Sequence, residues 1–119
     1  MTILLTGYPG FLGSALLPRI LARSPEVRVV CLVQPKFASL ARQRAARFGD
    51  RVQIAEGDIA SRIDLPPVEE IFHLAAVYDL SVSRELGMRV NVEGTRHVLD
   101  FAERCPSLHR FQYVSTCYV

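Results

Sequence analysis

The sequence predicts an α/β fold built on a doubly wound parallel sheet. Short, almost wholly apolar runs alternate along the chain with longer segments in which apolar residues recur every three or four positions. The runs are typical of strands buried on both faces, and the longer segments have the period of amphipathic helices. Strands and helices in alternation imply parallel strands joined by right-handed crossovers. A length of 119 residues, of which 50% are hydrophobic, suits one domain.

Five apolar runs are the predicted strands. They are Thr2–Thr6, Val27–Val33, Val52–Ala55, Glu70–Leu74 and Arg110–Ser115. The first run ends at a glycine, and only Arg28 interrupts the second. The connection after the third run ends in Pro66-Pro67, which predicts a loop with room for a single helical turn.

Three segments have the helical period. The first carries one apolar face made by Leu12, Ala15, Leu16 and Ile20. The second carries a face made by Phe37, Leu40, Ala41, Arg44 and Phe48. The third is the clearest, with a face made by Leu86, Val90, Gly94, Val98 and Phe101. Pro18 removes one backbone hydrogen bond, so we expect a distortion in the first helix.

The composition argues against several classes of protein. Aromatic residues make up only 8% of the chain, and the sequence lacks the basic stripe interleaved with aromatics that is typical of nucleic-acid-binding proteins. No apolar run reaches the roughly 18 to 20 residues of a membrane span, and the N-terminus lacks the basic region of a signal peptide. Cys31, Cys105 and Cys117 have no metal-like spacing and are expected to be buried, reduced thiols. These features favour a cytoplasmic globular protein.

A glycine-rich segment follows the first predicted strand. It reads Thr6-Gly7-Tyr8-Pro9-Gly10-Phe11-Leu12-Gly13, a G-x-x-G-x-x-G pattern placed before a helix. Gly7 would allow a sharp turn, Gly10 a close approach of the backbone to a diphosphate, and Gly13 close packing of helix on sheet. Turns and helix starts also collect glycine for structural reasons. Because this pattern lies between a strand and a helix, we assign it, including Phe11 and Leu12, to dinucleotide binding at the helix N-terminus.

The end of the second strand bears on which dinucleotide is bound. An acidic residue there would hydrogen-bond the adenosine ribose and repel a 2′-phosphate, but no acid occurs between Val33 and Asp50. Gln34 and Lys36 occupy this region, and Arg42 or Arg44 could reach it from the next helix. Residues 1–50 hold seven basic and two acidic side chains, a surplus of five positive charges, although such arginines are often only solvated. The pattern favours NADP over NAD.

Five motifs in register resemble the extended short-chain dehydrogenase/reductases. They are the glycine pattern, Gly57-Asp58-Ile59, His73-Leu74-Ala75-Ala76, Val90-Asn91-Val92-Glu93-Gly94-Thr95 and Tyr113-Val114-Ser115-Thr116. The run from His73 to Leu80 and the ending Val114–Val119 are most similar to the thioester-reductase and fatty-acyl reductase branch. The resemblance implies a Rossmann-type, doubly wound sheet with strand order 3-2-1-4-5. We expect the 119 residues to be a single domain, 1–119, truncated after the fifth strand.

The resemblance also implies roles around the adenosine and the diphosphate. Asp58 would accept a hydrogen bond from the adenine amino group, with the Ile59 backbone nearby; alone, Gly57-Asp58 would indicate a turn. Ala75, Ala76 and Val77 would lie under the cofactor at the end of the fourth strand. Small residues at such a junction are also ordinary packing.

Roles nearer the chemistry follow in the same way. Asn91 would hydrogen-bond the neighbouring strand's backbone near the site, the alternative being an exposed polar residue. Thr116 matches the catalytic Ser/Thr, whose hydroxyl would bind the substrate carbonyl while hydride arrives from the nicotinamide, and Ser115 is the second candidate. His73 lies in a buried run and is expected to be a hydrogen-bonded core histidine.

The proton donor of the family that this sequence resembles is not found among the 119 residues. That family uses a tyrosine followed four residues later by a lysine, and no Tyr-x-x-x-Lys occurs in the sequence. We therefore expect this chain to be the cofactor-binding part of a longer reductase that acts on a small carbonyl, thioester or alcohol substrate. A homodimer of that longer protein is compatible with this prediction. The 119 residues alone are expected to be inactive. A non-catalytic dinucleotide-binding module and a nucleotide-sugar epimerase or dehydratase are the alternatives.

Overall fold

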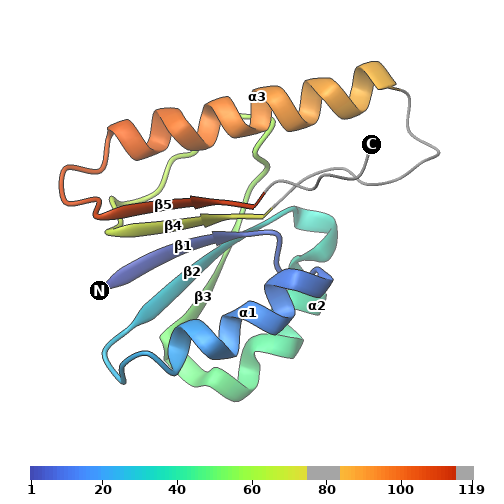
Figure 1. Ribbon diagram of the computed structural model, residues 1–119. Helices are drawn as coiled ribbons and strands as arrows, with labels where there is room; N and C mark the ends of the chain where they lie inside the picture. The colour runs from blue at the N-terminus through green and yellow to red at the C-terminus, as the bar shows by residue number, and fades with distance from the viewer. Residues whose placement is uncertain (75–83, 115–119) are drawn as a thin grey trace.

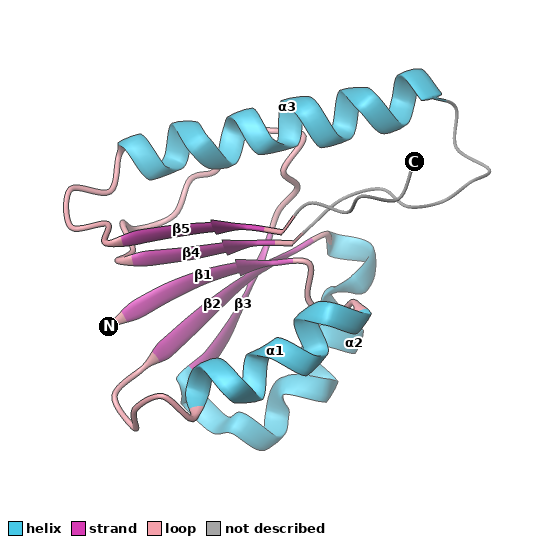
Figure 2. Ribbon diagram, viewed as in Figure 1, coloured by secondary structure: helices cyan, strands magenta, loops and turns pink. Residues whose placement is uncertain are grey.

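The computed structural model describes residues 1–74 and 84–114 as one five-stranded parallel sheet with helices on both faces (Figure 1). Helices α1 and α2 cover one face, and α3 covers the other (Figure 2). The strand order is β3-β2-β1-β4-β5, so the predicted doubly wound, Rossmann-type topology is confirmed.

The elements follow the predicted alternation. In chain order they are β1 (Thr2–Thr6), α1 (Phe11–Leu21), β2 (Arg28–Val33), α2 (Pro35–Ala45), the 3-10 helix η1 (Ala46–Arg51), β3 (Val52–Glu56), β4 (Glu70–His73), α3 (Arg84–Glu103) and β5 (Arg110–Tyr113). The connection between β3 and β4 contains turns but no helix, as Pro66-Pro67 predicted. Among the described residues, no helix has the length and apolar composition needed to cross a membrane.

The central strand β1 divides the core into two layers. Ile3 and Leu5 face α1 and α2, whereas Leu4 between them faces α3. This alternation is the period of two expected of a strand buried on both faces. On the α3 side, Val98 and Phe101 are buried against the sheet, as the spacing of the third helical segment predicted.

The apolar face predicted for α1 is confirmed at Ile20 and at the partly buried Leu16, but it is wrong at Leu12 and Ala15, which are exposed. Its buried residues are Gly13, Leu17, Ile20 and Leu21. Leu12 is 52% exposed, because Gly13 brings the next face of the helix against the turn after β1. The helix continues through Pro18, and the Ala22 N–H donates to the Pro18 carbonyl at 3.0 Å.

The apolar face predicted for α2 also needs correction. Its buried residues are the alanines Ala38, Ala41 and Ala45, which let the helix lie close to the sheet. Phe37 and Leu40 remain 45% and 40% exposed. These two larger side chains lie instead at the edge of a pocket. Cys31 and Cys105 are free and buried, as expected, and Cys117 lies outside the described residues.

Candidate functional site

The loop after β1 is built around three glycines that contact one another. Gly7 has a φ of 93°, which L-residues rarely adopt. The Gly10 N–H donates to the Gly7 carbonyl at 2.9 Å. A Cβ at Gly10 would lie 2.7 Å from that oxygen, and a Cβ at Gly13 would lie 2.5 Å from it. The glycine spacing is therefore required by backbone packing within the loop itself.

The N-terminus of α1 is open to a ligand. The first helical hydrogen bond runs from Ser14 N–H to the Gly10 carbonyl at 2.8 Å, so the N–H groups of residues 11–13 precede the ladder. No side chain caps the helix, and its first turn contains no acidic residue. The Ser14 hydroxyl donates to the Pro9 carbonyl at 2.9 Å and holds the loop on the helix. Backbone donors and the positive end of the dipole here suit a phosphate.

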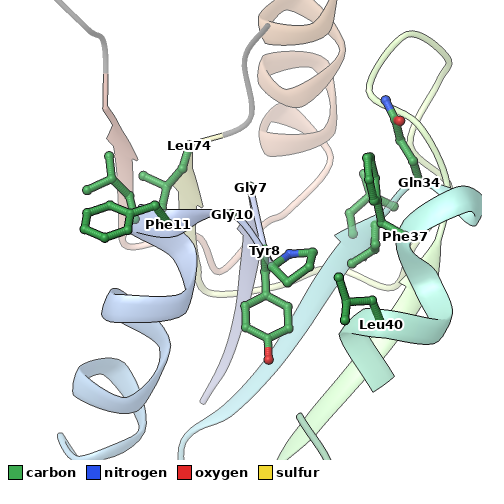
Figure 3. A pocket seen from close by; sticks show the side chains of 12 residues that line it. Gly7, Tyr8, Gly10, Phe11, Gln34, Phe37, Leu40 and Leu74 are labelled. Atoms are coloured by element: carbon green, nitrogen blue, oxygen red, sulfur yellow. The ribbon is translucent and has the colours of Figure 1, made fainter. Parts of the chain in front are cut away.

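A pocket of about 490 Å³ adjoins this N-terminus. Its walls come from the glycine loop, the end of β2, the start of α2 and the end of β4 (Figure 3). They are formed by Gly7, Tyr8, Pro9, Gly10, Phe11, Leu12, Leu32, Val33, Gln34, Phe37, Leu40 and Leu74. The volume is typical of small-molecule sites, which lie at the carboxyl ends of strands in open α/β sheets.

The predicted residues after β2 divide between the pocket and the surface. Gln34 lines the pocket at the N-cap position of α2, where its side chain makes no capping bond. Lys36 is exposed, with its ammonium 5.1 Å from the centre of the Phe37 ring. Arg42 instead forms an ion pair with Glu56 at 3.0 Å, so one of the two arginines considered for a phosphate already has an acidic partner.

The Gly57-Asp58-Ile59 segment forms a turn beyond β3. Gly57 N–H donates to the Val33 carbonyl at 2.9 Å, which fixes the segment beside the end of β2. Asp58 Oδ1 accepts from Ala60 N–H at 3.0 Å, an Asx turn. Ile59 is buried against α3, and Asn91 is half-buried on that helix. Asp58, Ile59 and Asn91 do not line the pocket described above.

His73 ends β4 as a hydrogen-bonded core residue, as expected. Its Nδ1 lies 2.7 Å from the Thr6 hydroxyl and its Nε2 3.1 Å from the Thr95 hydroxyl. The Thr6 hydroxyl also accepts from Leu74 N–H at 3.0 Å, and the imidazole stacks on Tyr113 with centroids 5.4 Å apart. Burial lowers the pKa of His73 to about 4, so the ring is neutral near pH 7.

Several predicted residues lie outside the described part of the chain. They are Ala75, Ala76, Val77, Ser115 and Thr116. The structure therefore places the glycine loop and Gln34 around one pocket, and the expected catalytic residue, Thr116, lies outside the described residues.

Residues 5–119 match the family model described as Male sterility protein, an NAD-binding family. The chain belongs to the Male sterility protein family. It is similar to fatty acyl-CoA reductase 1 of Gallus gallus, with 30% identity over 98% of this chain and 28% of that protein. The chain thus spans little more than a quarter of the length of this curated relative.

Solved structures place the Male sterility family chain among the short-chain dehydrogenase/reductases. The terminal R domain from the myxalamid PKS-NRPS biosynthetic pathway has 30% identity and a TM-score of 0.77, with 97% of this chain and 34% of that one covered. An Agrobacterium tumefaciens protein of the short-chain dehydrogenase/reductase superfamily, solved with bound NAD, has 25% identity and a TM-score of 0.68. That match covers 98% of this chain and 33% of the other. The predicted family resemblance is confirmed.

Sequence reasoning missed the apolar wall of the pocket in this Male sterility family chain. Tyr8 was only a variable position in the glycine pattern, yet its side chain is 6% exposed, and burial raises the pKa of its hydroxyl. Phe37 and Leu40 were assigned to the core. Their spacing from Gln34, three and six residues on, puts all three on one side of α2, and this signal could have identified them.

Proposed function

We propose that this chain is the cofactor-binding part of an NADP-dependent reductase. The single observation that carries the proposal is the uncapped N-terminus of α1, which opens beside a pocket of about 490 Å³ at the glycine loop. Membership of an NAD-binding family and similarity to reductases point in the same direction.

The residues of the site fit a dinucleotide. The N–H groups of residues 11–13 would hold the diphosphate, because α1 itself leaves them without intrahelical acceptors. Gln34 would hydrogen-bond the adenosine ribose from the pocket wall, and Asp58 would accept from the adenine amino group. Ala75, Ala76 and Val77 would support the cofactor beyond β4. When bound, the nicotinamide supplies hydride.

Two side chains support a preference for NADP. Gln34 stands where an acid would repel a 2′-phosphate, and Lys36 offers an exposed ammonium in the first turn of the following helix. The Agrobacterium relative has NAD bound, so the preference rests on these residues of the chain alone.

The substrate class comes from the relatives. The Gallus gallus relative is named a fatty acyl-CoA reductase, and we propose that the full-length protein reduces an acyl thioester or the related carbonyl. Thr116 would donate a hydrogen bond to the substrate carbonyl oxygen and stabilise the negative charge that develops there. Thr116→Ala in the full-length protein should lower kcat by about 10- to 1,000-fold while NADPH affinity is retained.

A titration tests the cofactor proposal. NADPH and NADH are each titrated into the full-length protein by calorimetry, and we expect tighter binding of NADPH. Lys36→Glu should weaken NADPH binding by about 5- to 10-fold and leave NADH unchanged. Arg19→Glu is the matched control, since Arg19 lies exposed in the last turn of α1, away from the glycine loop. Binding of neither dinucleotide would refute the proposal, and equal binding would refute the NADP preference alone.

A further inference from the structure

The segment between β3 and β4 takes its position from α3. Residues 57–69 contain no helix or strand, and the segment runs up to α3 before returning to the sheet (Figure 1). Ile59 and Ile63 are buried with Val98 and Phe101 of that helix. Hydrogen bonds from α3 and from the turn that follows it also reach the segment, at the carbonyls of Ile59 and Ile63. The helix therefore sets the conformation of a segment that lacks a hydrogen-bond ladder of its own.

Two residues of α3 contact Ile59. His97 Nδ1–H donates to the Ile59 carbonyl at 2.6 Å, and both residues are at least partly buried. One turn earlier on the helix, a Cβ at Gly94 would lie 2.5 Å from Ile59 Cδ1. The glycine thus leaves room for the Ile59 side chain while His97 holds its carbonyl.

The same peptide group joins His97 to Asp58. The Ile59 carbonyl and the Ala60 N–H belong to one planar peptide unit, whose two ends cannot rotate independently. His97 bonds the oxygen end of this unit, and Asp58 Oδ1 accepts from its N–H end at 3.0 Å. A rotation of the plane that breaks the first bond also turns the donor that orients the Asp58 carboxylate.

We propose that His97 is a positioning residue for adenine recognition, acting on the Asp58 carboxylate through the Ile59–Ala60 peptide. The inference rests on the proposed function, because it needs a dinucleotide whose adenine amino group meets Asp58. His97 itself touches the peptide and not the ligand. Its removal should weaken binding of the adenosine half of the cofactor and leave the nicotinamide half unaffected.

The experiment compares two variants of His97 with the wild type in the full-length protein. His97→Leu removes the donor, whereas His97→Asn keeps an N–H donor at nearly the position of Nδ1. ADP, NADPH and reduced nicotinamide mononucleotide are titrated into each, the last as a probe without adenine. For His97→Leu we expect ADP and NADPH to bind about 3- to 10-fold more weakly, with the mononucleotide unchanged. His97→Asn should restore most of the loss.

Arg104→Met is the matched control. Arg104, the residue directly after α3, donates from Nη2 to the Ile63 carbonyl at 2.8 Å. This is also a side-chain bond to a carbonyl of the same segment, but four residues beyond Ile59. This variant should lower stability without changing ADP affinity. If His97→Leu and Arg104→Met weaken ADP equally, or if His97→Leu lowers only the melting temperature, His97 has a structural role and the inference is wrong. If wild-type protein binds neither ADP nor NADPH, the proposed function fails instead.

Discussion

Replacing Gly13 by alanine probes the packing that forms the glycine loop. The added Cβ would lie 2.5 Å from the Gly7 carbonyl oxygen, 2.9 Å from its carbon and 3.1 Å from Tyr8 Cα. All three atoms are backbone, so no side chain can rotate away. Ordinary contact begins at 3.4 Å, and α1 and the loop must therefore separate by almost 1 Å.

The cost follows from this forced movement. Overpacking in a well-packed region costs about 1 to 3 kcal/mol, and a clash with backbone belongs at the upper end. The shift also displaces the Gly7 turn from the N–H groups of residues 11–13, so we expect NADPH affinity to fall by about tenfold or more. Alanine's better helix propensity offsets less than about 1 kcal/mol.

Gly87→Ala in α3 is the control for Gly13→Ala. A Cβ at Gly87 would meet nothing within 4 Å, so the same substitution should be neutral or stabilise by up to about 1 kcal/mol. Urea unfolding measures the free energy of unfolding of both variants, and calorimetry measures NADPH affinity. A Gly13→Ala protein as stable as Gly87→Ala and with unchanged affinity would refute the packing argument.

Two further predictions concern stability. Arg51 donates to three backbone carbonyls at the end of α1 and in the turn that follows, at 2.6, 2.8 and 3.2 Å. Arg51→Met should therefore lower the free energy of unfolding, measured in urea, by about 1 to 3 kcal/mol, and Arg51→Lys should lie between Arg51→Met and the wild type. Equal stability of the wild type and both variants would contradict this role. His73 has a folded pKa of about 4 against 6.5 for the free side chain, so the unfolded state binds more protons between these values. Stability should be fully present above pH 6.5 and fall by up to about 3 kcal/mol towards pH 4, and a His73→Gln variant with the same loss between pH 6.5 and 4 would assign it to other groups.

The sheet could be predicted from sequence because its signal is local. All five apolar runs became strands within two residues of their expected limits, since a strand buried on both faces must be continuously apolar. The predicted inner faces of α1 and α2 were wrong at some positions for one shared reason, although Ile20 and Ala41 are buried as predicted. Hydrophobic periodicity ranks large side chains as buried, but both helices approach the sheet through small residues, Gly13 in α1 and the alanines of α2.

The candidate site was predictable where backbone chemistry defines it. The glycine spacing predicts a sharp turn at Gly7 and a closely packed helix at Gly13, and the structure contains both. The diphosphate contact expected at Gly10 stays a prediction. Side-chain partners depend on contacts between distant segments and could not be read in the same way. Arg42 pairs with Glu56 from the neighbouring strand, and no spacing in the sequence joins these two residues.

Helix α3 makes two side-chain hydrogen bonds to other segments that the spacing of its apolar residues does not predict. Thr95 bonds the imidazole of His73, which is linked in turn to Thr6 immediately before the glycine loop. Two residues later, His97 bonds the segment that carries Asp58. Because the β3–β4 connection has no helix, a shift of α3 would move both ends of the proposed cofactor site together. Variants at Thr95 should then alter diphosphate binding, and variants at His97 adenine binding, although both side chains lie on one turn of a single helix.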